Sequence, residues 1–166
     1  MESKAWYAVR VKPKGEGQAS DELSTRGFEV FLPTHHVRCR WSDRVKTLKL
    51  PLFPGYLFCR FRPGERVGVL DAPAVIQVLG IGRIPIPVTD AEIEAIQKMV
   101  ASSLTLTPWP YLRSGQRIRI EHGPLAGIDG IITDAEDGKT RVVVSVTFLQ
   151  RSVAAVIERD WIALMS

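Results

Sequence analysis

The side chains of this chain that could do chemistry are suited to binding rather than to reaction. Nucleophilic catalysis needs a nucleophile, a histidine and a carboxylate held together, and no such arrangement is evident in the sequence. A metal site at His35, His36 and Cys39 would lack an evident fourth ligand, so we interpret these residues as surface positions of a loop entering a strand. We therefore expect no enzymatic activity, no metal and no cofactor.

The octet at residues 51–58, PLFPGYLF, is the most informative candidate for a binding surface. Two prolines and a glycine interrupt a run of aromatic and aliphatic residues. Proline donates no ladder hydrogen bond and suits a strand entrance, whereas Gly55 permits a turn. The octet predicts a rigid apolar corner leading into a strand at 56–61. Such a corner is either an entrance to the core or a docking surface, and the residues alone leave both open.

Basic residues are concentrated in the first third of the chain. Residues 1–60 carry 11 Lys/Arg against 6 Asp/Glu, residues 61–111 carry 4 against 5, and residues 112–166 carry 7 against 7. This asymmetry indicates a face that meets a polyanion, with nucleic acid the first candidate, or else a solvated basic surface. The side chains in question are Arg10, Lys12 and Lys14 after the first predicted strand, and Arg38, Arg40, Arg44, Lys46 and Lys49 in a predicted hairpin.

The composition is typical of a globular protein, and the low number of cysteines favours a reducing compartment. Hydrophobic residues make up 45% and charged residues 24% of the chain. The sequence contains neither an apolar stretch of about 20 residues nor a secretion signal at its start. Cys39 and Cys59 are too few for a disulfide framework, and we expect them to be half-buried strand residues. We therefore expect a cytoplasmic protein that does not contact a membrane.

Hydrophobic patterning predicts an α+β fold with two domains. Residues 1–104 predict an antiparallel sheet flanked by helices, residues 105–111 a semi-rigid linker with two prolines, and residues 112–166 a small five-stranded β-barrel. In the first domain the pattern favours strands at 6–11, 28–32, 37–41, 45–50, 56–61 and 74–79, and helices at 16–26 and from 89 onward. In the second it favours strands at 117–121, 130–133, 141–148 and 154–157.

Two sets of motifs in these domains resemble a known family. Residues 115–130, GQRIRIEHGPLAGIDG, are similar to a KOW motif, which is carried by Gly115, Gly123, Pro124 and Gly130. The first domain resembles the NGN domain of NusG-type transcription factors. That resemblance rests on Trp6-Tyr7, on residues 53–56 (FPGY) and on residues 87–93 (PVTDAEI). It spans residues 5–162, and residues 41–44 with 51–58 are similar to the specialised RfaH and UpxY type.

The resemblance implies a transcription elongation and antitermination factor that acts at selected operons. In that family the NGN domain docks on the clamp helices of RNA polymerase, closes the cleft and suppresses pausing or termination. The resemblance implies that an apolar pocket for the clamp helices is lined or shaped by Tyr7, Phe53, Pro54, Gly55 and Tyr56. The alternative is that Phe53 and Tyr56 simply fill the domain core.

Further partners are implied in the same way. Arg10, Lys12 and Lys14 would face the non-template DNA strand near the upstream fork, with Arg38 and Arg40 as a second basic patch. The KOW domain would recruit a partner such as ribosomal protein S10 or Rho, with contacts at Leu125, Ile128 and Phe148. The β-prone run at 142–148 favours a barrel over a helical hairpin, and we expect a monomer.

Two other functions remain open on the sequence. One is a housekeeping NusG that links polymerase to Rho or to the ribosome. The other is a general KOW RNA-binding protein of ribosomal type, which should concentrate Lys/Arg in the barrel. The second domain carries equal numbers of basic and acidic residues, and this favours the polymerase-bound factor.

Overall fold

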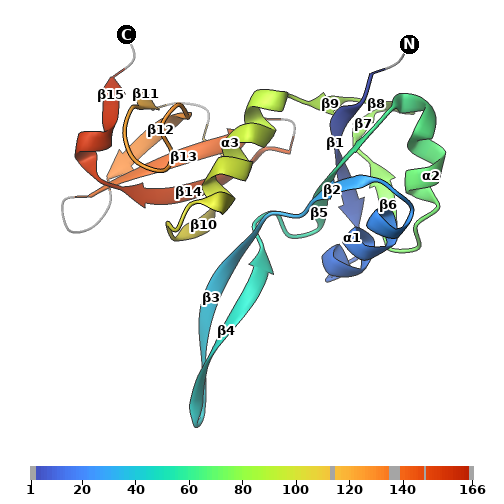
Figure 1. Cartoon of the computed structure of the whole chain (residues 1–166), viewed down its shortest axis with the longest axis horizontal. Coiled ribbons are helices and arrows are strands. Elements are labelled where there is room, and N and C mark those ends of the chain that lie inside the picture. The colour runs from blue at the N-terminus through green and yellow to red at the C-terminus, as the bar shows by residue number, and fades with distance from the viewer. Residues whose placement is uncertain (1–2, 113–114, 135–138, 148, 165–166) are drawn as a thin grey trace. The chain divides into compact units, whose positions relative to one another are not determined.

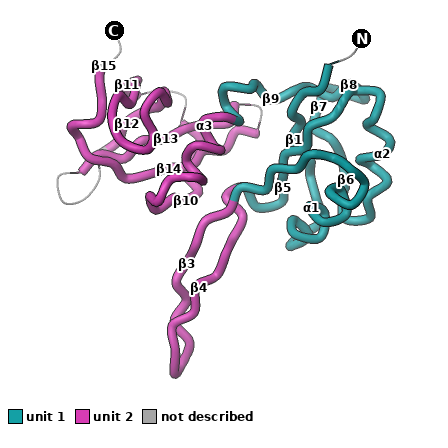
Figure 2. The backbone as a smooth tube through the Cα atoms, in the orientation of Figure 1, with its two compact units in different colours: residues 1–33, 53–93 teal, residues 34–52, 94–166 magenta. Residues whose placement is uncertain are grey.

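The computed structural model describes residues 3–112, 115–134, 139–147 and 149–164. The chain divides into two compact units, Met1–Pro33 with Phe53–Ile93 and Thr34–Leu52 with Glu94–Ser166 (Figure 2). Antiparallel sheets form the framework of both units, and the predicted α+β class is confirmed.

The first unit contains a five-stranded sheet in the order β2-β5-β1-β6, with β9 also pairing with β1 (Figure 1). Its strands are β1 (Ala5–Val11), β2 (Glu29–Phe31), β5 (Tyr56–Phe61), β6 (Val75–Val78) and β9 (Pro87–Val88). The other elements of this unit are the helices α1 (Glu16–Thr25), η1 (Pro63–Glu65) and α2 (Arg66–Leu70), and a short hairpin of β7 (Gly80–Ile81) and β8 (Ile84–Pro85).

Both faces of this sheet are covered by apolar side chains. On one face the buried cluster includes Tyr7, Val9 and Val11 of β1, and the i,i+4 pair Ala19 and Leu23 of α1. That cluster also contains Leu57, Cys59, Phe61 and Val69. A sheet that is buried on both sides explains why β1 and β5 read as nearly continuous apolar runs.

The second face of the sheet is an aromatic layer. Trp6, Ala8 and Phe58 are buried there. The ring centroid of Phe58 lies 6.0 Å from that of Phe31 and 5.6 Å from that of Phe53. These edge and stacked contacts place Phe53 of the octet in the core of the unit.

The second unit contains a two-stranded ribbon and a six-stranded sheet. The ribbon pairs β3 (Thr34–Trp41) with β4 (Arg44–Pro51). The sheet has the order β10-β14-β13-β12-β11-β15. Its strands are β10 (Leu106–Trp109), β11 (Gln116–Ile120), β12 (Asp129–Asp134), β13 (Thr140–Val146), β14 (Arg151–Ile157) and β15 (Ile162–Leu164), with the short helix η3 (Arg159–Trp161) before β15.

The helix α3 (Asp90–Ala101) begins in the first unit and continues into the second. Thr89 caps it as its sequence predicts, because the backbone N–H of Glu92 donates to Thr89 Oγ1 at 3.3 Å. The predicted apolar stripe is also seen, with Ile93, Ile96 and Met99 buried.

The structure corrects the expected linker at 105–111. Residues Leu106–Trp109 form β10, which pairs with β14 through Leu106↔Ala155 to Trp109↔Ser152. Pro108 is compatible with this strand because β10 lies at the edge of the sheet, which is the position where a sheet tolerates proline. The second sheet therefore has six strands rather than the expected five, and its β13 and β14 confirm strands where a helical hairpin was the alternative.

Candidate functional site

The corner at residues 53–56 is a tight turn that the sequence specifies directly. The backbone N–H of Tyr56 donates to Phe53 O at 3.0 Å, and Gly55 has φ +88°. Proline at the second position, glycine at the third and a positive φ at that glycine together define a type II turn. A Cβ at Gly55 would meet no atom within 4 Å, so glycine is required by backbone conformation and not by space.

Two neighbouring elements hold this turn in place. Gly55 N–H donates to Glu16 Oε2 at 3.1 Å, and Val11 N–H donates to Gly55 O at 2.9 Å. Glu16 is 7% exposed, and its carboxylate is therefore removed from water and engaged with the backbone of the turn. Glu16 opens α1, where a negative charge also suits the helix N-terminus. Sequence reasoning missed this residue, because nothing in its local pattern distinguishes a buried first-turn glutamate from an exposed one.

The structure separates the five predicted polymerase-binding residues by exposure. Tyr7 is 3% exposed, with its ring 4.5 Å from that of Phe61, and Phe53 is 1% exposed. Pro54 is exposed, and Gly55 and Tyr56 are half-buried. The accessible apolar surface of the corner is thus Pro54 and Tyr56, and the two buried aromatics support it from within.

A cation lies directly beside the accessible tyrosine. Arg10 is the cross-strand partner of Tyr56 on β5 and of Gln77 on β6. Residues directly opposite each other in an antiparallel pair project from the same face. Arg10 and Gln77 are exposed, so this end of the sheet presents a row in which the Arg10 guanidinium lies between the Tyr56 ring and the Gln77 amide.

Lys12 and Lys14 continue this basic surface into the turn after β1. Both are exposed, and no ion pair is seen for Arg10, Lys12 or Lys14 within the described part of the chain. Lys14 has φ +59°, a left-handed conformation in which glycine or asparagine is favoured over lysine. A lysine in this strained conformation is compatible with a role for its charge.

Glu22 lies on α1 near this surface, but its carboxylate is occupied. Glu22 Oε2 accepts the backbone N–H of Ala74 at 3.1 Å, and its Oε1 accepts Gln18 Nε2 at 2.9 Å. Lys12 N–H in turn donates to Ala74 O at 2.9 Å. Glu22 therefore fixes the segment before β6, which itself orients the start of the basic turn.

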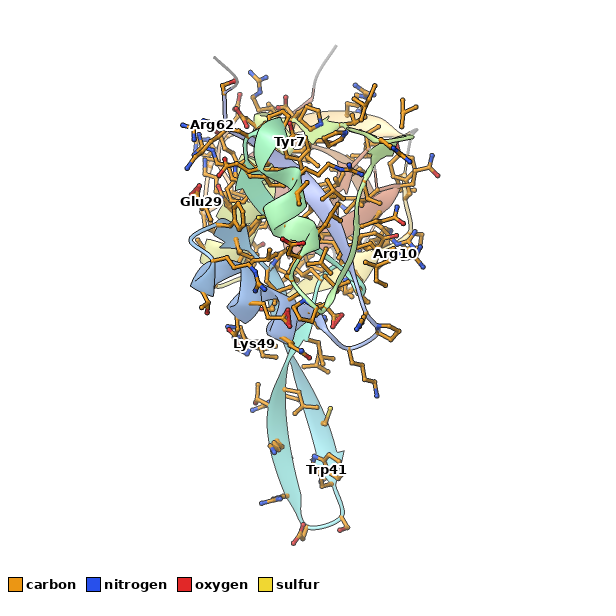
Figure 3. All side chains as sticks on the ribbon, turned by 90° about the vertical axis from the view of Figure 1, so that its right-hand side faces the viewer. Tyr7, Arg10, Glu29, Trp41, Lys49 and Arg62 are labelled. Carbon is orange, nitrogen blue, oxygen red and sulfur yellow. The ribbon has the colours of Figure 1, made fainter. Side chains whose placement is uncertain are left out.

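Arg38 and Arg40, the other predicted nucleic-acid contacts, lie on β3 of the ribbon. Both side chains are exposed, and they share one face because they are two residues apart on a strand. Trp41 marks the tip of the ribbon and Lys49 lies near its base (Figure 3).

The predicted KOW glycines occupy positions where a side chain would not fit. At Gly115 an added Cβ would lie 2.6 Å from a methyl group of Ile131. At Gly123 it would lie 2.8 Å from the Trp161 ring, and at Gly130 it would lie 2.6 Å from a methyl group of Val142. Pro124 is exposed in the turn after β11.

The cross-strand partners Arg119 and Asp129 brace the same region. Arg119 Nε donates to Asp129 Oδ1 at 2.8 Å, and this hydrogen bond lowers the pKa of Asp129 below its usual value. Sequence reasoning did not single out this pair.

The predicted contacts of the KOW domain are mostly interior. Leu125 is fully buried and Ile128 is 4% exposed, while Phe148 lies outside the described residues. Leu125 and Ile128 are therefore buried side chains of the segment between β11 and β12, and their role in partner binding stays a prediction.

The histidines and cysteines do not gather. His35 and Cys39 project from one face of the ribbon and His36 from the other, and within the described ranges no three His, Cys, Asp or Glu side chains are placed to hold a metal. His35 Nδ1 lies 3.1 Å from Leu106 O, joining the base of the ribbon to the start of β10.

Burial raises the pKa of the Cys59 thiol to about 12, with Glu65 and Glu29 adding to the effect. No helix in the described residues is long and apolar enough to cross a membrane.

Comparison with known proteins identifies the family. Residues 4–97 match the family model described as "NusG: Transcription termination factor nusG". The chain is 27% identical to the transcription termination/antitermination protein NusG of Pseudomonas aeruginosa, with 94% of this chain and 96% of that protein covered. It is 28% identical to the NusG of Thermus thermophilus, with 85% and 89% covered.

A solved structure of Thermotoga maritima NusG agrees in fold. It matches 99% of this chain and 98% of its own length with a TM-score of 0.62 at 20% identity. The closer resemblance to the RfaH and UpxY type stays a prediction. The family match covers more than half of the chain, and the same relatives span nearly all of it, so the chain belongs to the NusG family of transcription termination and antitermination factors.

Proposed function

We propose that this protein binds the clamp helices of RNA polymerase through the corner at residues 53–56 and suppresses pausing or termination. The observation that carries the proposal is the pairing of Tyr56 with Arg10 at one end of the sheet. A half-buried aromatic side chain on a rigid turn loses little conformational entropy when a helix packs on it, and tyrosine and arginine are enriched among energetically dominant interface residues.

The buried residues of the corner support this role by fixing its shape. Tyr7 and Phe53 pack in the two layers that cover the sheet, and Glu16 holds the turn by a hydrogen bond to Gly55. A pre-formed surface of this kind binds without having to order a loop.

The basic surface next to the corner is proposed to face the non-template DNA strand. Arg10, Lys12 and Lys14 project from the strand end and turn that adjoin Tyr56, so one docking event would bring both the protein and the nucleic-acid contacts into place. Charged contacts of this kind supply affinity by releasing counterions from phosphates.

The experiment is a comparison of two tyrosine variants for binding to core RNA polymerase. Tyr56→Ala should weaken binding by about 30-fold, the effect of losing about 2 kcal/mol at an interface anchor. Tyr111→Ala, which removes another half-buried tyrosine from the second unit, is the matched control and should leave the affinity within twofold. Circular dichroism and melting curves establish that each variant is folded.

A pausing assay on a leader template then tests the activity. Wild-type protein should shorten pauses, and Tyr56→Ala should lose this effect at concentrations that saturate wild-type binding. Equal polymerase affinity for wild type and a folded Tyr56→Ala variant would refute the assignment of the corner.

A housekeeping role is the second candidate, because the relatives named above are termination/antitermination NusG proteins. Such a role would link polymerase to Rho or, through ribosomal protein S10, to the ribosome. A Rho-dependent termination assay separates the two: a housekeeping factor enhances termination, whereas a specialised antiterminator reduces it at its own operons.

A further inference from the structure

The ribbon of β3 and β4 accounts for the entire net charge of the protein. Residues 34–51 carry five cations, Arg38, Arg40, Arg44, Lys46 and Lys49, against the single acid Asp43. The ribbon therefore has a net charge of +4, the same as the whole chain, and all remaining residues together sum to zero. The excess of positive over negative charge is thus located in one short arm, and the rest of the chain carries equal numbers of basic and acidic residues.

The register distributes these cations over both faces of the ribbon. The pairs His36↔Lys49, Arg38↔Thr47 and Arg40↔Val45 belong to one face, and Cys39↔Lys46 and Trp41↔Arg44 to the other. One face therefore presents Arg38, Arg40 and Lys49, and the other presents Arg44 and Lys46 beside Trp41. The outer half of the ribbon is cationic on both sides.

The fold does not use these cations. All five are exposed, none has an ion pair within the described ranges, and no residue of β3 or β4 is buried. Trp41 at the tip is 55% exposed. A surface that only solvates an arm would mix charges of both signs in similar numbers, as the rest of the chain does, and an excess of five cations over one acid indicates a polyanionic partner.

The dimensions of the ribbon select the form of that polyanion. Two paired strands are about 4.8 Å apart, and the major groove of a DNA duplex, about 12 Å wide, admits a two-stranded ribbon. Residues two apart on a strand are about 6.8 Å apart, which is twice the axial spacing of about 3.4 Å between phosphates on one DNA strand. A groove also has a phosphate backbone on each side, which matches cations on both faces.

We propose that the ribbon is a duplex-DNA-binding arm that enters a groove and contacts phosphates through Arg38, Arg40, Arg44, Lys46 and Lys49. Trp41 at the tip is the aromatic side chain available to pack against the groove. The inference deepens the proposed function by assigning a double-stranded partner to a surface distinct from Arg10, Lys12 and Lys14. It does not require polymerase, so the two proposals can fail separately.

The test measures binding of the intact protein to a labelled mixed-sequence DNA duplex of about 24 base pairs by fluorescence anisotropy, without polymerase. Arg38→Gln/Arg40→Gln removes two cations from the ribbon. Arg117→Gln/Arg151→Gln removes two exposed cations from β11 and β14 and is the matched control, because it changes net charge equally. A single strand of the same length forms a second arm of the experiment.

Each phosphate contact contributes a slope of about 0.9 to the dependence of log K on log salt for a duplex. The ribbon variant should therefore flatten the slope by about 1.8 and weaken binding about 60-fold in 0.1 M salt, relative to the 1 M limit. The control should change both by far less, and the ribbon variant should retain its affinity for the single strand. Melting curves establish that both variants fold.

Three outcomes would overturn the inference. Equal losses in the ribbon and control variants would mean that net charge alone attracts DNA. A wild-type protein that does not bind the duplex at low salt would remove the partner altogether. Tighter binding of the single strand, lost in the ribbon variant, would assign the arm to unpaired nucleic acid instead.

Discussion

Replacing Gly55 by alanine tests whether the corner depends on its left-handed backbone. Gly55 has φ +88°, and a Cβ there would meet nothing within 4 Å, so the substitution introduces conformational strain without a clash. An L-residue in this region is disfavoured by about 1–2 kcal/mol, partly offset by the lower entropy of the unfolded alanine chain. We expect a net loss of about 1 kcal/mol.

Gly17→Ala is the control with the opposite expected sign. Gly17 lies in α1, and a Cβ there also meets nothing within 4 Å. Alanine should stabilise this helix by about 0.5–1 kcal/mol, because glycine loses more backbone entropy on folding. The two chemically identical substitutions should therefore differ by about 1.5–2 kcal/mol.

Native-state hydrogen exchange of the β1 and β5 amides measures this difference in the intact chain. Opening free energies that differ by 1.5–2 kcal/mol correspond to roughly 10- to 30-fold in exchange rate, with Gly55→Ala the faster. Gly55→Asn should lie between wild type and Gly55→Ala, because asparagine tolerates the left-handed region. Exchange in Gly55→Ala that is as slow as in wild type would refute the argument.

The remaining predictions concern a strained lysine, the thiols and an ion pair. Lys14→Gly should stabilise the fold by about 1 kcal/mol while flattening the salt dependence of single-strand binding by about 0.7, and denaturant titration with anisotropy would show whether stability and affinity move oppositely. Cys59, whose pKa is raised to about 12 by burial, should resist alkylation at pH 8 in the native state, so that Cys39→Ser removes the fast-reacting thiol seen by mass spectrometry. Arg119 holds the pKa of Asp129 below its usual 3.8, so the pair stabilises the folded state at pH values above 3.8, and this stabilisation is lost as the pH falls further. Asp129→Asn should therefore reduce the dependence of the melting temperature on pH in the acid range. The change should be small because the pair is exposed.

Local signals in the sequence predicted the elements well. The Pro-Gly turn, the strand at 56–61 and the Thr89 cap are each set by residues within a few positions, and each is found where its pattern places it. The expected linker was wrong, because two prolines rule out a central strand but not an edge strand. Which edge is available depends on how the other strands pair.

The sequence by itself determined the alternation of side chains along β1 and β5, the required glycine of the corner and the confinement of net charge to one hairpin. Only the tertiary structure decided which aromatics are covered. Tyr7 and Tyr56 have similar local contexts, yet Tyr7 is in the core and Tyr56 reaches the surface beside Arg10. The reason is that a period of two fixes which residues share a face, whereas burial depends on what packs over that face, and those elements come from distant parts of the chain. The same holds for Glu16, whose partner Gly55 is 39 residues away and could not be read from its neighbours.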